Sequence, residues 1–166
     1  MKGRLLCFAF LCPGWLMSCD TQPSLPGTAL GTYSIQAAMH ANSCGDQLGA
    51  PDPWAFDAEL SRDGDLLYWR QNGQLLSGSL DSSAKATISS SQADQVGSNS
   101  NCSMTRTDTL AVVLGTDPAP PLSGGLTFGF DAPVATCSDL LLSHGGSYTA
   151  LPCTIEYTLT ATKKTE

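Results

Sequence analysis

The chain has 166 residues, with 15 acidic and 8 basic side chains and a formal net charge of −7. Its length is that of one domain, once a short leader is set aside. A surface with this acidic balance repels a phosphate backbone, so we expect no nucleic-acid partner.

The first 19 residues have the pattern of an export signal. Lys2 and Arg4 precede an apolar run, residues 5–17. That run of about 13 residues is too short to span a bilayer, which needs roughly 20. It closes with Leu16-Met17-Ser18-Cys19. An ordinary secretory peptidase prefers small residues just before its cleavage site, and Leu16 does not suit that preference.

This ending resembles the lipobox of bacterial lipoproteins and departs from it at Met17, where a smaller residue is usual. The resemblance implies cleavage before Cys19, a diacylglyceryl thioether on its sulfur, and acyl chains that hold the protein to a membrane. A plain secreted protein and an uncleaved anchor are the alternatives.

The resulting domain plan has three parts. We expect a signal peptide at 1–18, the lipidated cysteine and a flexible proline-rich tether at 19–29, and an all-β domain at 30–166. The domain would lie on the exported side of a membrane, in the periplasm or at the cell surface.

The cysteines suggest how that domain is stabilised. Cys7 and Cys12 would leave with the signal, so four remain besides the lipid site: Cys44, Cys102, Cys137 and Cys153. An even number in an exported chain predicts two disulfides. Of the three connectivities we favour Cys44–Cys102 with Cys137–Cys153, because the second pair would close a short hairpin-like excursion.

A metal site is the rival explanation for these cysteines. None of them stands at Cys-x-x-Cys spacing, and only His40 and His144 could add ligands. We therefore expect no metal, and no motif indicates a cofactor.

Alternation of apolar and polar residues predicts strands in the first half of the domain. The apolar faces of the first two strands are Tyr33, Ile35, Ala37 and Met39, then Trp54, Phe56, Ala58 and Leu60. Asp63-Gly64 and Asn72-Gly73 lie on either side of the apolar run 66–69. Both dipeptides suit tight hairpin turns that require positive φ, which predicts a three-stranded antiparallel meander.

The second half has a weaker pattern. A strand is predicted through Ala84, Ala86 and Ile88, then a loop or frayed edge at 89–101, then a strand from Cys102 to Leu114. Prolines exclude 116–125 from a central strand, and alternation resumes at 126–130. One or two helical turns are predicted at 138–143. The last strand, 153–161, alternates an apolar face with a threonine-rich wet face.

These elements predict an all-β fold: a single antiparallel meander of seven to nine strands that forms a small β-barrel or β-sandwich, with two disulfides. The meander and the opening Gly31-Thr32-Tyr33 loosely resemble lipocalin-type small barrels. Both architectures remain open at this point.

No catalytic motif emerges from the sequence. Ser143-His144, near Asp139, lacks a Gly-x-Ser-x-Gly elbow, and adjacent strand residues point to opposite faces. Asp63-Gly64-Asp65 lacks the further oxygen ligands of a calcium loop. Three acids could form a glycosidase pair, but we expect them on a solvated face: Asp57, Glu59 and Glu156.

Three aromatic residues are candidate binding contacts: Trp69, Tyr68 and Trp54. The first two are consecutive, so one faces inward and the other outward if both lie in a strand. We expect a binding or interaction module of the bacterial cell envelope that engages an envelope protein, a glycan or a small apolar ligand. The alternatives are a structural or assembly lipoprotein without a ligand, and a hydrolase with an unrecognised site.

Overall fold

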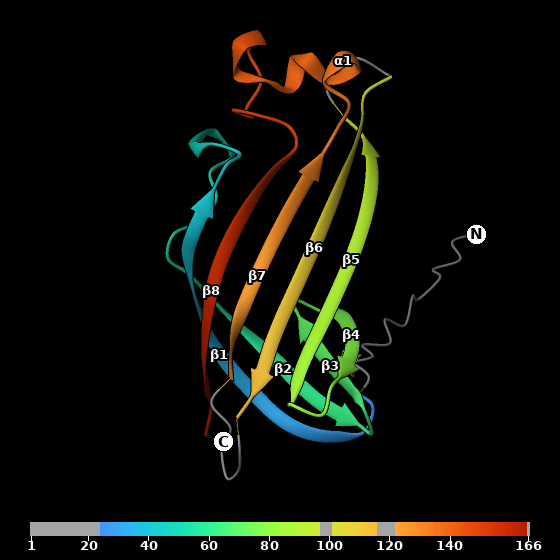
Figure 1. Ribbon diagram of the computed structural model, residues 1–166. Coiled ribbons are helices and arrows are strands. Elements are labelled where there is room, and N and C mark those ends of the chain that lie inside the picture. The colour runs from blue at the N-terminus through green and yellow to red at the C-terminus, as the bar shows by residue number, and fades with distance from the viewer. Residues whose placement is uncertain (1–23, 97–100, 116–121, 166) are drawn as a thin grey trace, which may run out of the picture.

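The protein is an antiparallel β-barrel. The computed structural model describes residues 24–96, 101–115 and 122–165. Within these ranges the strands pair in chain order and close on themselves (Figure 1). They are β1 (Thr28–Asn42), β2 (Trp54–Asp63), β3 (Leu66–Gln71), β4 (Gln74–Leu80), β5 (Lys85–Gln95), β6 (Ser103–Leu114), β7 (Leu122–Asp131) and β8 (Cys153–Lys163). The predicted all-β meander is confirmed as a barrel, and the sandwich alternative is wrong.

The expected signal peptide, Cys19 and the first part of the tether lie outside the described residues. β1 begins at Thr28, so the last two residues of the expected tether belong to the barrel. Just before the strand, the Ser61 hydroxyl donates a hydrogen bond of 2.6 Å to the Pro26 carbonyl. The folded domain therefore starts slightly earlier than residue 30.

Short helices occupy two of the connections. The 3-10 helix η1 (Asp46–Leu48) follows β1. Between β7 and β8 lie α1 (Val134–Cys137), η2 (Ser138–Leu140) and η3 (Leu142–His144), in place of the one or two turns predicted at 138–143. We call residues 132–152 the cap segment; it lies at the upper end of the barrel in Figure 1. Among the described helices, none is long and apolar enough to span a bilayer.

Both predicted hairpins form. Asn72 and Gly73 join β3 to β4 with φ values of 49° and 78°, as a type I′ turn requires. The turn between β2 and β3 is shifted by one residue from the prediction. Asp63 still pairs with Leu66, so the two turn residues are Gly64 and Asp65.

The prediction of a loop or frayed edge at 89–101 is wrong for its first part, because β5 continues to Gln95. Residues 97–100 lie outside the described part of the chain. β5 pairs with β6 along its whole length, from Lys85 opposite Val113 to Gln95 opposite Ser103. The side chains here are too polar to show an apolar face. The pairing instead places hydroxyl beside hydroxyl, with Ser91 Oγ 3.3 Å from the Thr107 Oγ1.

The excluded segment 116–125 is also partly a strand. β7 begins at Leu122, directly after the last proline, and Ser123, Gly124 and Gly125 pair with both β6 and β8. The prolines therefore precede the strand and cost it no ladder hydrogen bond. Residues 116–121 lie outside the described part of the chain.

The barrel is closed and filled at its lower end. Side chains from facing strands, among them Tyr33, Ile35, Leu60, Leu67 and Leu159, are 0–1% exposed and form its core. The Tyr33 hydroxyl has no hydrogen-bond partner among the described residues, and burial raises the pKa of this phenol. Packed side chains therefore fill the inside of the barrel at this end.

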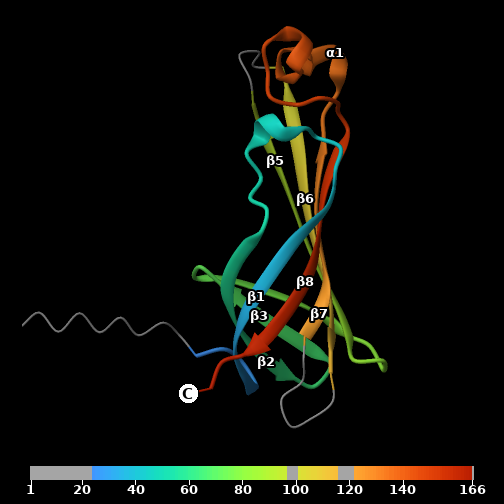
Figure 2. The ribbon, with the colours of Figure 1, turned by 90° about the vertical axis from the view of Figure 1, so that its left-hand side faces the viewer.

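At the upper end the wall is incomplete. β4 pairs with β5 only at Ser79–Thr87 and Leu80–Ala86, and β2 reaches no further along β1 than Ala37. Above this level β5, β6, β7, β8 and β1 continue as a curved sheet, which Figures 1 and 2 show rising past the β3–β4 hairpin. The barrel is therefore open at its upper end, and its wall is lower on the side of β2, β3 and β4.

Two disulfides are present, but the connectivity that we favoured is wrong. Cys44 bonds Cys153, and Cys102 bonds Cys137, with Cα–Cα distances of 5.0 and 4.9 Å. Cys44 follows β1 and Cys153 begins β8, so barrel closure brings these distant residues together. Cys102 precedes β6, and Cys137 follows its neighbour β7. Each bridge thus ties the end of one strand to the start of an adjacent one.

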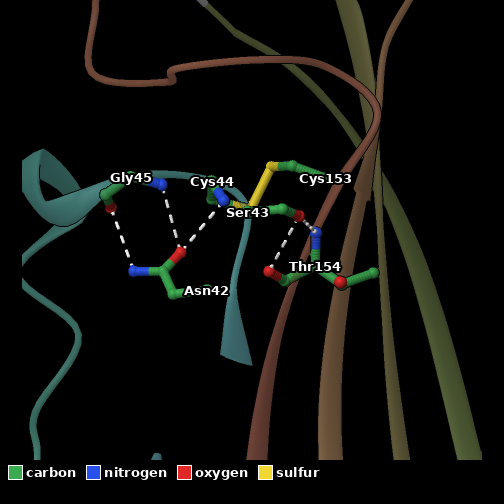
Figure 3. Close-up of a disulfide and its surroundings, with 6 residues drawn as sticks. All are labelled: Asn42, Ser43, Cys44, Gly45, Cys153 and Thr154. Carbon is green, nitrogen blue, oxygen red and sulfur yellow. Dashed lines mark hydrogen bonds between the residues drawn. A yellow bond between two sulfur atoms is a disulfide. The ribbon is translucent and has the colours of Figure 1, made fainter. Parts of the chain in front are cut away.

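Hydrogen bonds hold the Cys44 side of the first bridge (Figure 3). Asn42 Oδ1 accepts from the backbone N–H groups of Cys44 and Gly45 at 2.9 and 3.1 Å. The Thr154 N–H donates to the Ser43 hydroxyl at 2.8 Å, and that hydroxyl donates to the Thr154 carbonyl at 3.2 Å. The end of β1 is therefore fastened to β8 by both covalent and polar contacts.

A candidate ligand pocket in the barrel mouth

A cavity of about 230 Å³ opens where β4 and β5 diverge. Its apolar lining comes from six strands, β2 to β7, and consists of Trp54, Phe56, Trp69, Leu76, Ile88, Leu110, Leu126 and Phe128. Its polar lining consists of Gln71, Asn72, Gln74, Ser90, Arg106 and Asp108. The cavity therefore has an apolar floor and a polar rim.

The aromatic part of the floor follows from period-2 alternation in β2, β3 and β7. The Trp54 and Phe56 ring centroids are 4.5 Å apart, and Phe56 lies 6.5 Å from Trp69 in an edge-to-face arrangement. Trp54 also lies 6.4 Å from Phe128. Trp69 is 1% exposed, whereas Trp54, Phe56 and Phe128 are half-buried and present part of their surface to the cavity.

The rim carries one ion pair, on β6. Leu110, Val112 and Leu114 are buried, so Arg106 and Asp108, which have the same parity, also face the barrel interior. Arg106 Nε donates to Asp108 Oδ1 at 2.7 Å, and the guanidinium lies 4.8 Å from the centre of the Phe128 ring. The two charges cancel, and both side chains are partly exposed, so the pair adds little stability.

Two tyrosines lie near the cavity but do not line it. The Tyr148 ring, from the cap segment, lies 5.7 Å from Phe130. Burial raises the pKa of Tyr148, and the Arg106 charge offsets part of that rise. Burial also raises the pKa of Tyr157, as does the Asp52 carboxylate, and the Tyr157 hydroxyl donates to the Pro51 carbonyl at 3.0 Å. Both phenols are therefore neutral at physiological pH.

The structure brings together two of the three candidate aromatics. Trp54 and Trp69 line the cavity. Tyr68 lies on the outer face of β3, because it alternates with the buried Leu67 and Trp69. The sequence analysis did not identify Arg106 and Asp108 as site residues. They could have been found, because they are polar residues at inward positions of a strand whose later inward positions are apolar.

The other candidate residues lie outside this cavity. Asp57, Glu59 and Glu156 alternate with inward residues and so lie on the outer face, as expected. Lys164 Nζ is 2.5 Å from the Asp57 carboxylate, and Arg70 pairs with Glu59. Ser143 and His144 are exposed neighbours in η3. Within the described ranges, His, Cys, Asp and Glu form no group of three that could hold a metal ion.

Comparison with known proteins adds no relative: no protein-family model, no curated protein and no solved structure matches the chain significantly.

Proposed function

We propose that this chain is a binding module of the bacterial cell envelope that holds a small molecule in the mouth of its barrel. The observation that carries the proposal is the open, aromatic-floored cavity above a filled core. A concave, mostly apolar pocket with a few convergent polar groups is typical of a small-molecule site.

The size of the cavity limits the ligand. A cavity of about 150 Å³ holds benzene, so about 230 Å³ accommodates about nine non-hydrogen atoms. That corresponds to one or two small rings, or to the end group of a larger molecule. The hydrolase alternative gains no support, because the acidic candidates lie outside the cavity.

The envelope location rests on the sequence. We propose that Cys19 carries the lipid that anchors the domain to a membrane. Intact mass of the protein from a membrane fraction should then correspond to a chain that starts at Cys19 with added acyl mass. A Cys19→Ser variant should lose both the added mass and the membrane association. An unmodified mass in the soluble fraction would refute the anchor without touching the binding proposal.

Binding can be tested on the full-length Cys19→Ser chain by saturation-transfer difference NMR. The probes are ring compounds of about a dozen non-hydrogen atoms or fewer, indole and methyl β-glucopyranoside among them. We expect at least one probe to bind saturably. Trp54→Ala should weaken the binding of that probe about tenfold or more, because it removes one of the two half-buried aromatic rings on β2.

Tyr68→Ala is the matched control. It removes an aromatic residue from the outer face of the same sheet and should leave binding unchanged. If no probe binds, or if both variants lose binding equally, the barrel mouth is not the site.

A further inference from the structure

We propose that the ligand of this pocket is a neutral sugar: one pyranose ring of a glycan. This inference rests on the proposed function and specifies its ligand class. It comes from the juxtaposition of an aromatic platform on β2 with a charge-balanced rim of amide, hydroxyl, guanidinium and carboxylate groups.

The platform suits one face of a sugar ring. Trp54 and Phe56 are both half-buried, and their centroids lie 4.5 Å apart with the ring planes tilted by 41°, so a sugar can stack on one ring of the pair rather than across both. A pyranose with equatorial hydroxyls has a face made of C–H groups, which carries partial positive charge and packs on the electron-rich face of an aromatic ring. The opposite wall is less suited to stacking, because the Arg106 guanidinium already lies over Phe128.

The rim suits the edge of the same ring. Asn72, Gln74 and Ser90 line the cavity, and none of their side chains forms a hydrogen bond within the described part of the chain. Amides and hydroxyls both donate and accept hydrogen bonds, as each sugar hydroxyl also does. All three side chains are exposed, so they can exchange bound water for hydrogen bonds to the sugar hydroxyls, which a purely apolar ligand does not offer.

The charges on the rim favour a neutral ligand. Arg106 and Asp108 are paired at 2.7 Å through Nε, which leaves the terminal nitrogens of the guanidinium outside that pair. An ionic ligand would be attracted to one partner and repelled by the other. Sugar hydroxyls can accept from the guanidinium and donate to the carboxylate at the same time, so they satisfy both.

The volume indicates an end-on arrangement. A hexopyranose has about a dozen non-hydrogen atoms, and a cavity of about 230 Å³ takes about nine. The ring therefore enters while one side stays outside. Since the cavity opens where β4 and β5 diverge, that side can carry the link to the next sugar of a chain.

The test compares four probes on the full-length Cys19→Ser chain by saturation-transfer difference NMR. Two are neutral sugars, methyl β-glucopyranoside and methyl N-acetyl-β-glucosaminide; the others are methyl β-glucuronide, an anionic analogue, and indole. We expect a low-millimolar Kd for at least one neutral sugar, and weaker binding of the glucuronide and of indole.

Rim variants add a second criterion. Asn72→Gly combined with Gln74→Ala removes two rim amides and keeps a turn residue that tolerates φ of 49°. This double variant should weaken the bound sugar about tenfold, whereas Tyr68→Ala should leave it unchanged.

The outcomes separate the two proposals. Saturable binding of indole without binding of either neutral sugar would overturn the sugar inference and leave the binding function intact. Tighter binding of the glucuronide than of both neutral sugars would overturn it as well. If no probe binds, both proposals fail.

Discussion

The two disulfides should differ in their contribution to stability, and the difference follows from barrel closure. Cys44–Cys153 spans 109 residues of sequence, and Cys102–Cys137 spans 35. In the loop-entropy model, bridges closing loops of these lengths stabilise the folded state by about 5 and about 4 kcal/mol. Each is comparable to the whole unfolding free energy of a marginal domain.

The perturbation is a pair of double variants. Cys44→Ala with Cys153→Ala removes the longer loop, and Cys102→Ala with Cys137→Ala removes the shorter one. Urea unfolding followed by tryptophan fluorescence gives both losses, because the core residue Trp69 reports on the barrel. We expect the first variant to be the less stable by about 1 kcal/mol.

Peptide mapping without reduction provides the independent check. The digest should contain one crosslinked peptide pair that joins Cys44 to Cys153 and another that joins Cys102 to Cys137. A peptide that joins Cys44 to Cys102 would refute the connectivity. A larger loss from the shorter loop would refute the entropic reasoning, even with the connectivity intact.

Three further predictions concern the core. Tyr33→Phe should raise the unfolding free energy by about 1 kcal/mol, because it removes a buried hydroxyl without a partner among the described residues; a loss of stability in urea would contradict this. The free energy of unfolding should fall as pH rises above about 10. Burial raises the folded-state pKa of Tyr33, Tyr148 and Tyr157, so the unfolded chain releases these protons first. A pH titration of the unfolding free energy that stays flat to about pH 11 would refute this prediction. Gly124→Ala should destabilise by about 1–3 kcal/mol, since its Cβ would lie 2.1 Å from a backbone oxygen of β6, while Gly125→Ala, at 3.5 Å from the nearest atom, should be nearly neutral in the same assay.

Local chemistry was sufficient to predict much of the barrel. Alternation identified the inward faces of β1, β2 and β8, because burial on one side of a strand selects apolar residues at every second position. Asn72-Gly73 placed a hairpin correctly, because few other residue pairs adopt positive φ cheaply at both positions. The same alternation places Trp54 and Trp69, two of the three candidate aromatics, at inward positions that line the pocket.

Other features depended on neighbours in space. The polar stretch after Ile88 is a strand only because β6 lies beside it and supplies backbone partners. β7 starts as soon as the prolines end, because two flanking strands offer hydrogen bonds to Ser123 and the two glycines that follow. Neither pairing can be predicted from a single segment, since strand formation here depends on which strand lies beside that segment.

The sequence by itself determined the alternating strands, the tight turns and the number of cysteines available for bridges, because each depends on residues close together in the chain. Only the tertiary structure decided which cysteines pair, since closure of β1 on β8 places Cys44 beside Cys153 across 109 residues. It also decided the pocket, since Arg106 and Asp108 meet the aromatic floor from the far side of the barrel. Contacts between distant strands are set by closure and register, which no local pattern encodes.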